Sequence, residues 1–280
     1  MTGVAPVPPV VDAAWVRGHP DVVLADVRWT PSAASGPRSD GRAVHAAGHL
    51  PGAVFVDLDR DLAGEPSAAA GRHPLPSPER FAEAMSRLGI DDDDVVVAYD
   101  ADVGAIAARL VWMLRATGRA AALLDGGLAA WDGPIETGEV ARPPARFTAR
   151  PWPGDRLADA DEVARVAAAP ESLVIDARAR ERYLGEVEPI DARAGHVPGA
   201  VSLPFAGNVD GGRFRPVDEL RTRFAEAAAA DDVVVYCGSG VTACHDVLAL
   251  ERAGIQARLY PGSWSAWSSD PARPVATGEG

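Results

Sequence analysis

Short apolar runs alternate with helical stretches along the whole chain. Apolar runs that are bounded by charged or turn residues predict buried strands. The expected strands cover 22–26, 53–56, 95–99 and 121–124 in the first half, and 173–177, 200–203, 233–236 and 257–260 in the second. Helices are expected at 78–88, at 104–117 and from the end of strand 233–236 to Arg252. Because this alternation is typical of a mainly parallel sheet flanked by helices, the sequence predicts an α/β fold.

The two halves of the chain carry matching segments in the same order. Residues 23–28 match 173–178, the G-H-x-P-G-A stretch 48–53 matches 195–200, and 96–99 matches 233–236. The offset falls slowly, from 150 between Asp26 and Asp176 to 136 between Trp131 and Trp267. A duplicated domain with a few loop deletions gives this pattern. We therefore expect one domain at 1–135, a linker rich in Pro, Gly and Arg at 136–157, and a second domain at 158–280.

Composition excludes several classes of function. The 280 residues include 40 acidic and 27 basic side chains, for a net charge of −13, and every basic one is arginine. An acidic chain without basic clusters predicts no binding to nucleic acid or to an anionic membrane. The lack of lysine excludes a lysine Schiff base. With two cysteines, no zinc spacing, no long apolar run and no secretory signal, we expect no metal and a cytoplasmic location.

The stretch 237–244, which reads C-G-S-G-V-T-A-C, carries the clearest chemical signal. It places Cys237 where a buried strand turns into a helix. Two glycines allow the loop backbone to curl, so that its N–H groups converge on the sulfur and the helix dipole favours an anion. A thiolate held in this way is a nucleophile for group transfer. Packing explains Cys244 adequately, and a Cys237–Cys244 disulfide is disfavoured because it would distort the start of the helix.

This loop resembles the active-site loop of the rhodanese superfamily, and it is more like that of 3-mercaptopyruvate sulfurtransferases than that of thiosulfate rhodaneses. The resemblance implies two tandem rhodanese-like domains, with Asp100 at the cysteine position of the first. It also implies sulfur transfer through a Cys237 persulfide to a thiol, such as thioredoxin or a small thiol, or to cyanide, without a metal or organic cofactor. The backbone that holds the outer sulfur would then come from Gly238, Ser239, Gly240, Val241 and Thr242.

The resemblance also suggests which residues bind and protonate the substrate. Arg182 matches the family arginine that binds the substrate carboxylate. The second family arginine, in an E-P-R segment, is replaced by Ile190, and Arg193 is the candidate substitute. A Ser–His–Asp proton relay is assigned to Ser239 and His49 by motif position and to Asp40 by its distance before His49. His196 holds the same position in the second repeat, so a structural G-H-x-P-G turn is the alternative for His49.

Three other functions are known for a cysteine loop of this kind. Thiosulfate:cyanide sulfurtransferases share the persulfide but prefer a cationic loop, which Gly238 and Ser239 do not supply. A cysteine-dependent phosphatase needs an arginine at the end of the loop, where this chain has Ala243, and is rejected. A persulfide carrier for a protein partner is the non-enzyme alternative, and turnover of small donors separates it from an enzyme.

Overall fold

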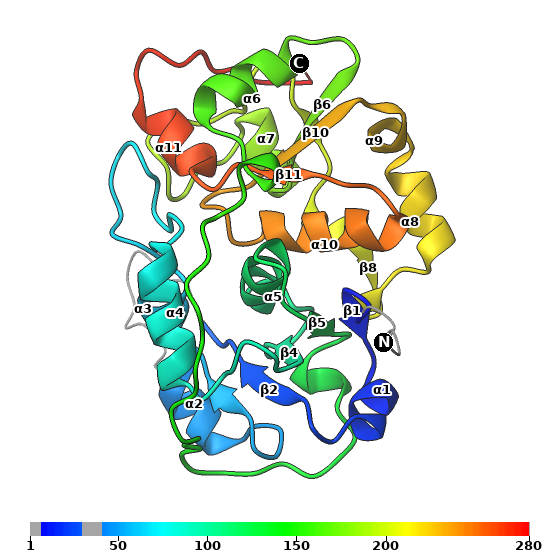
Figure 1. The fold of residues 1–280 in the computed structure, drawn as a ribbon. Helices are drawn as coiled ribbons and strands as arrows, with labels where there is room; N and C mark the ends of the chain where they lie inside the picture. Colours follow the sequence, from blue (N-terminus) through cyan, green and yellow to red (C-terminus); the bar gives the residue numbers. More distant parts are fainter. Residues whose placement is uncertain (1–6, 30–40, 280) are drawn as a thin grey trace. The chain divides into compact units, whose positions relative to one another are not determined.

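The computed structural model describes residues 7–29 and 41–279, which divide into two compact units. Unit 1 is formed by the chain up to Leu62 together with Pro76–Pro151. Unit 2 is formed by Trp152–Gly280 together with Ala63–Leu75 (Figure 1). The expected domains are continuous in sequence, whereas the units are not, because the 63–75 segment of the first half belongs to the second unit.

Unit 1 is built on a parallel five-stranded sheet with the order β1-β5-β4-β2-β3. Its strands are β1 Val10–Val11, β2 Val23–Asp26, β3 Val54–Phe55, β4 Val96–Tyr99 and β5 Ala121–Leu124. The strands β4 and β5 are buried along their whole length, as expected for parallel strands covered on both faces. The four strands expected in this half of the chain are therefore confirmed.

The helices of unit 1 begin where the sequence offers good caps. Ser77 accepts a hydrogen bond from the backbone N–H of Arg80 at 3.2 Å, and Pro78 occupies the first helical position. This cap fixes the start of α4 at the expected place. The α-helices are α1 Ala13–Gly18, α2 Gly41–Ala47, α3 Leu58–Asp61, α4 Pro78–Arg87 and α5 Ala107–Ala116, and the 3₁₀ helix is η1 Leu128–Ala130.

The linker expected at 136–157 lacks helices and strands up to residue 153, but much of it packs on unit 1. Phe147 is buried and meets Phe81 edge to face. The Asp92 carboxylate accepts the backbone N–H of Thr148 at 3.0 Å and also binds the Arg119 guanidinium. These contacts hold the first part of the connection against unit 1.

Unit 2 repeats the same plan with a parallel sheet of order β11-β10-β6-β7. Helices α6 and α11 lie on one face of this sheet, and α8 and α10 lie on the other (Figure 1). Its strands are β6 Ser172–Asp176, β7 Val201–Ser202, β10 Asp232–Tyr236 and β11 Arg258–Leu259, with an antiparallel hairpin of β8 Val209–Asp210 and β9 Arg213–Phe214. Its helices are η2 Gly154–Arg156, α6 Ala160–Ala167, α7 Arg180–Leu184, η3 Phe205–Asn208, α8 Val217–Arg223, α9 Ala225–Ala229, α10 Ala243–Ala253 and α11 Ser263–Ser269.

A buried polar network in unit 1 reappears in unit 2 and supports the duplication. In unit 2, Asp176 binds the Arg178 guanidinium at 2.6 Å and accepts the Tyr236 hydroxyl at 2.7 Å. In unit 1, Asp26 pairs in the same way with the matching arginine, and it accepts the Tyr99 hydroxyl at 3.1 Å. In each unit the tyrosine oxygen also accepts a backbone N–H from the G-H-x-P-G turn. The sequence matches therefore correspond to one repeated structural unit.

Over residues 7–29 and 41–279, every helix is too short or too polar to cross a lipid bilayer.

Candidate active site

Cys237 follows the last residue of β10 and is 2% exposed. Both cysteines carry free thiols. The Cys237 backbone is fixed on both sides, because its N–H donates to Ser263 Oγ at 3.1 Å and its carbonyl accepts the Trp264 N–H at 2.9 Å. Ser263 adopts a φ of 51° at this position, a backbone conformation that residues other than glycine rarely adopt. A strained residue therefore fixes the backbone of the candidate nucleophile.

The loop after Cys237 curls back over the sulfur. The backbone N–H of Gly240 donates to Cys237 Sγ at 3.2 Å. Gly240 has a φ of +77°, and a Cβ there would lie 2.5 Å from the Pro261 carbonyl oxygen. Only glycine fits this turn without a shift of the backbone. The glycine at 240 is thus required for the N–H group that faces the sulfur.

The corresponding loop of unit 1 surrounds a carboxylate with backbone N–H groups. Asp100 stands where unit 2 has its cysteine, and the carboxylate is 6% exposed. It accepts four backbone N–H groups at 2.8–3.2 Å, those of Asp102, Gly104, Ile106 and Ala107. The loop of unit 2 joins the equivalent strand and helix with one residue fewer, since α10 begins six residues after Cys237 and α5 begins seven residues after Asp100. The carboxylate cradle of unit 1 is therefore an analogy for a thiolate site, and it supports that hypothesis.

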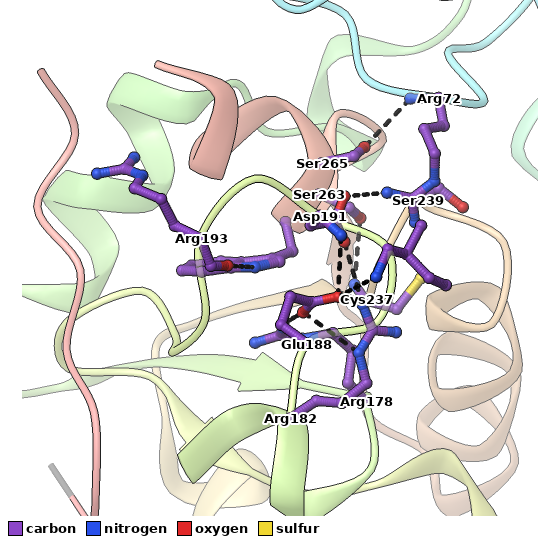
Figure 2. A network of polar contacts seen from close by, with 12 residues as sticks. Arg72, Arg178, Arg182, Glu188, Asp191, Arg193, Cys237, Ser239, Ser263 and Ser265 are labelled. Carbon is purple, nitrogen blue, oxygen red and sulfur yellow. Dashed lines mark hydrogen bonds and ion pairs between the residues drawn. The ribbon is translucent and has the colours of Figure 1, made fainter. Parts of the chain in front are cut away.

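Ser239 lies in this loop and is 9% exposed. Its hydroxyl hydrogen-bonds with His73 Nδ1 at 2.8 Å. His73 belongs to the 63–75 segment, which is held on unit 2 by the Arg72 N–H donating to Ser265 Oγ at 3.1 Å (Figure 2). His73 was not predicted as a site residue. The available signal was the polar pair Arg72–His73 in a stretch otherwise rich in Gly, Ala and Pro.

Two arginines lie beside the start of the loop. A Cβ placed on Gly238 would be 3.1 Å from Arg72 Nη2 and 3.4 Å from Arg182 Nη1. Arg182 also binds Glu188 at 2.6 Å and Asp191 at 3.1 Å, and Arg72 binds the same Asp191 (Figure 2). The expected Arg182 is therefore next to the loop, together with Arg72, which no sequence motif indicated.

Arg193 is engaged elsewhere in unit 2. Its guanidinium donates to four backbone carbonyl groups at 2.6–3.0 Å, those of Trp267, Ser268, Asp270 and Arg273. Figure 2 shows the side chain directed away from Cys237. The end of α11 presents carbonyls that lack helical partners, and a guanidinium satisfies them well. Arg193 therefore stabilises the backbone near the end of α11 and does not lie at the cysteine loop.

His49 is fully buried inside unit 1, where its Nδ1 hydrogen-bonds with the His45 carbonyl at 2.9 Å. His196 repeats this arrangement in unit 2, with Nδ1 bonded to the Tyr183 carbonyl at 2.8 Å. Burial lowers the pKa of His196, although that hydrogen bond acts in the opposite direction. The repetition supports a structural turn at both histidines. Asp40, the third member expected for the relay, lies outside the described residues.

Val241, Thr242 and Cys244 lie where the cysteine loop joins helix α10. Val241 is 4% exposed, and Thr242 stands immediately before α10, which begins at Ala243. The Cys244 thiol is fully buried and donates to the Gly240 carbonyl at 3.4 Å. Cys244 thus packs in the first turn of α10, as expected.

Comparison with known proteins places these features in a family. The model of the rhodanese-like domain matches residues 13–133 and again 159–270. A Pseudomonas aeruginosa protein provisionally named as a 3-mercaptopyruvate sulfurtransferase is 44% identical, over 93% of this chain and 94% of its own. A Mycobacterium tuberculosis protein provisionally named as a thiosulfate sulfurtransferase is 42% identical, over 95% of this chain and 94% of its own.

A solved structure gives the same result. The crystal structure of SseA from Escherichia coli, described as a 3-mercaptopyruvate sulfotransferase, aligns with a TM-score of 0.79 at 32% identity. The alignment covers 92% of this chain and 99% of that one. With two family matches, these relatives and a cysteine loop on a repeated parallel α/β unit, the chain belongs to the rhodanese-like family.

Proposed function

We propose that this sulfurtransferase takes a sulfane sulfur from 3-mercaptopyruvate and passes it to a thiol through a persulfide on Cys237. The observation that carries the proposal is the hydrogen bond of 2.8 Å between Ser239 Oγ and His73 Nδ1, in the loop that holds the thiol. Mercaptopyruvate needs a proton donor at this place because its carbon must take up a proton when sulfur leaves. Thiosulfate has no such need, since its leaving group is sulfite.

The first half-reaction uses the thiolate as a nucleophile. Cys237 Sγ attacks the sulfur of the donor, a new S–S bond forms, and the C–S bond breaks with its electron pair going to carbon. The resulting enolate of pyruvate accepts one proton at its methylene carbon through Ser239, with His73 as the group that supplies it. Pyruvate leaves, and Cys237 carries the transferred sulfur. The relay proposed on His49 by sequence motif is the alternative, and the burial of His49 speaks against it.

The second half-reaction returns the enzyme to its starting state. His73 regains a proton from the acceptor thiol or from water. The acceptor thiolate then attacks the outer sulfur of the persulfide, and Cys237 leaves as a thiolate. The Gly240 N–H, which donates to Sγ at 3.2 Å, stabilises the negative charge that returns to this sulfur. A protein thiol such as thioredoxin, a small thiol or cyanide completes this step. A working thiol of this kind also suits a reducing compartment, so we propose the cytoplasm.

Thiosulfate is the second candidate donor, and the name of the Mycobacterium tuberculosis relative favours it. Arg72 and Arg182 supply positive charge beside Gly238, although the loop itself has none. Glu188 and Asp191 bind these arginines and offset that charge. A site with balanced charge suits the singly charged carboxylate of mercaptopyruvate better than a dianion.

The test compares sulfur release from the two donors with a single thiol acceptor. Wild-type protein is expected to prefer 3-mercaptopyruvate in kcat/KM, and Cys237→Ser is expected to abolish turnover of both donors. Cys244→Ser is the matched control, because a serine hydroxyl can still donate to the Gly240 carbonyl. A preference for thiosulfate would overturn the choice of donor. Activity that survives Cys237→Ser would overturn the persulfide mechanism, and stoichiometric transfer without turnover would favour a carrier.

A further inference from the structure

The second substrate arginine is missing from its usual segment, yet two guanidinium groups lie beside the cysteine loop. Ile190 occupies the expected position and is 56% exposed. Arg72 and Arg182 both reach the space next to Gly238, within 3.1 Å and 3.4 Å of where a Cβ would stand. The glycine therefore leaves room that the two guanidinium groups border.

The Asp191 carboxylate binds both of these guanidinium groups. One oxygen pairs with Arg72 Nη1 and the other with Arg182 Nη2, the latter at 3.1 Å (Figure 2). The Asp191 side chain is only 4% exposed. An arginine pair that shares one buried carboxylate has the donor geometry that binds the carboxylate of a small acid.

We propose that Arg72 and Arg182 together form the donor's carboxylate subsite, and that Asp191 occupies this subsite in the free protein as an internal competitor. The inference rests on the proposed function and deepens it. A 2-oxo acid must displace Asp191 from at least one guanidinium group before its own carboxylate binds.

The segment that carries Asp191 suits such a displacement. Residues 186–194 contain no helix or strand and are held by a turn, in which Glu188 Oε1 accepts the backbone N–H of Ile190 at 3.1 Å and of Asp191 at 3.0 Å. Glu188 also binds Arg182 at 2.6 Å, so the turn stays fixed when Asp191 moves. Burial raises the pKa of Asp191, against the effect of the neighbouring Arg72, which eases removal of its negative charge.

The arrangement predicts how the donor is selected. Each new anion competes with Asp191 for the same N–H groups and meets its negative charge nearby. A singly charged carboxylate replaces Asp191 one for one, whereas dianionic thiosulfate adds an uncompensated charge. Asp191 is therefore a specificity-determining residue that favours the monoanion.

The binding test uses pyruvate, which has the carboxylate and keto group of the donor but no sulfur to transfer. Binding to Cys237→Ser protein is measured by calorimetry, with and without Asp191→Asn. We expect about tenfold tighter binding with Asp191→Asn, because charge-assisted hydrogen bonds become available to the ligand. Arg72→Ala in the Cys237→Ser background is expected to weaken binding by about tenfold. Unchanged affinity in either variant overturns the proposal.

Two controls separate a local effect from a general one. Glu186→Gln removes one negative charge from the same segment at an exposed side chain and leaves both arginines bound to Asp191, so it should not tighten pyruvate binding. Tighter binding with this variant overturns the competitor model in favour of a general charge effect. If Asp191→Asn lowers the melting temperature, Arg72→Ala alone tests the proposal. Arg72 is 32% exposed, so its truncation is expected to leave the protein folded. Since pyruvate binding needs no turnover, failure here is distinct from failure of the sulfurtransferase proposal.

Discussion

Substitution of Ser239 or His73 is expected to affect the two candidate donors differently. Ser239→Ala and His73→Gln each remove the proposed proton path to the carbon of mercaptopyruvate. We expect kcat for this donor to fall by roughly 10²- to 10⁴-fold, the usual contribution of a positioned acid or base. The measurement is pyruvate release at fixed acceptor concentration.

The same two variants supply their own control. Sulfite release from thiosulfate requires no protonation at carbon, so its rate in Ser239→Ala and His73→Gln should stay within a few-fold of wild type. An equal loss for both donors would mean that the pair shapes the cysteine loop instead of moving a proton. Loss of activity in neither reaction would remove Ser239 and His73 from the mechanism.

Truncation of Arg182 is expected to change substrate binding, whereas truncation of Arg193 is expected to change stability. Arg182→Ala should raise the KM for mercaptopyruvate by roughly 10- to 100-fold, because a charged hydrogen-bond partner of the substrate is lost. Arg193→Ala removes four hydrogen bonds to carbonyls at and just beyond the end of α11, so it should lower the free energy of unfolding by about 2 kcal/mol with KM unchanged. Steady-state kinetics and urea unfolding of both variants check this. A raised KM in folded Arg193→Ala protein would restore the expectation drawn from the sequence.

The case of Arg193 shows a limit of reading side chains from motifs. The chain indicates that an arginine follows Glu188-Pro189, but it does not indicate which groups compete for that arginine. In the structure, backbone carbonyls about 75 residues away accept all the described hydrogen bonds of its side chain. Such a choice depends on where α11 ends in space, which no local pattern encodes.

At the scale of elements, local signals were sufficient. The strands follow from apolar runs, α4 from a capped start, and the end of α10 from Gly254, which adopts a φ of 88°. The cysteine loop is also a local feature, because its shape depends on neighbouring residues such as Gly240. The hairpin β8–β9 was not predicted, since each strand has only two residues and leaves no detectable alternation.

Helix α10 begins directly after the cysteine loop and carries a buried acid, Asp246. This acid makes the free energy of unfolding of the protein depend on pH. Burial raises the pKa of Asp246 to about 7, although the Asn208 amide donates to it and acts in the opposite direction. Its second oxygen has no partner among the described residues. The folded state thus keeps a proton that the unfolded chain releases near pH 4. The stability that this proton contributes is fully present below about pH 4 and is lost as pH rises to about 7.

Asp246→Asn should therefore stabilise the protein in one pH range only. The amide stays neutral, so at pH 8 we expect the variant to exceed wild type by on the order of 2 kcal/mol in free energy of unfolding, with little difference at pH 4. Other titrating groups cancel when the two proteins are compared at each pH. Urea unfolding at pH 4 and pH 8 gives the result, and a difference independent of pH would contradict it.

At the scale of the whole molecule, the site combines segments that are distant in sequence. Ser239 and His73 are 166 residues apart, and the 63–75 segment that carries His73 contains no helix and no strand. The repeat indicates two units but does not indicate that a loop of one half packs into the other. Irregular loops carry no periodic signal, so Arg72 and His73 were visible only as a polar pair outside any recognised motif.

Gly71 allows a direct test of whether the packing of the 63–75 segment on unit 2 serves the site. It has a φ of +85°, and a Cβ would lie 2.6 Å from the Gly262 carbonyl oxygen and 2.7 Å from Ser265 Oγ. Gly71→Ala should therefore push the 63–75 segment off α11 and displace Arg72 and His73 together. Because such a clash costs about 1–3 kcal/mol, we expect kcat/KM for mercaptopyruvate to fall roughly 10- to 100-fold.

Gly52→Ala is the matched control for this last prediction. Gly52 has a similar φ of +72°, but a Cβ there meets no described atom within 4 Å, so it shares the backbone cost without the clash. Both variants should lose similar amounts of stability from the positive φ, and only Gly71→Ala should lose activity. Circular dichroism and kinetics on the two proteins decide the matter. Equal activity in both would mean that the 63–75 segment does not serve the site, and that the proton donor and second arginine lie elsewhere in the chain.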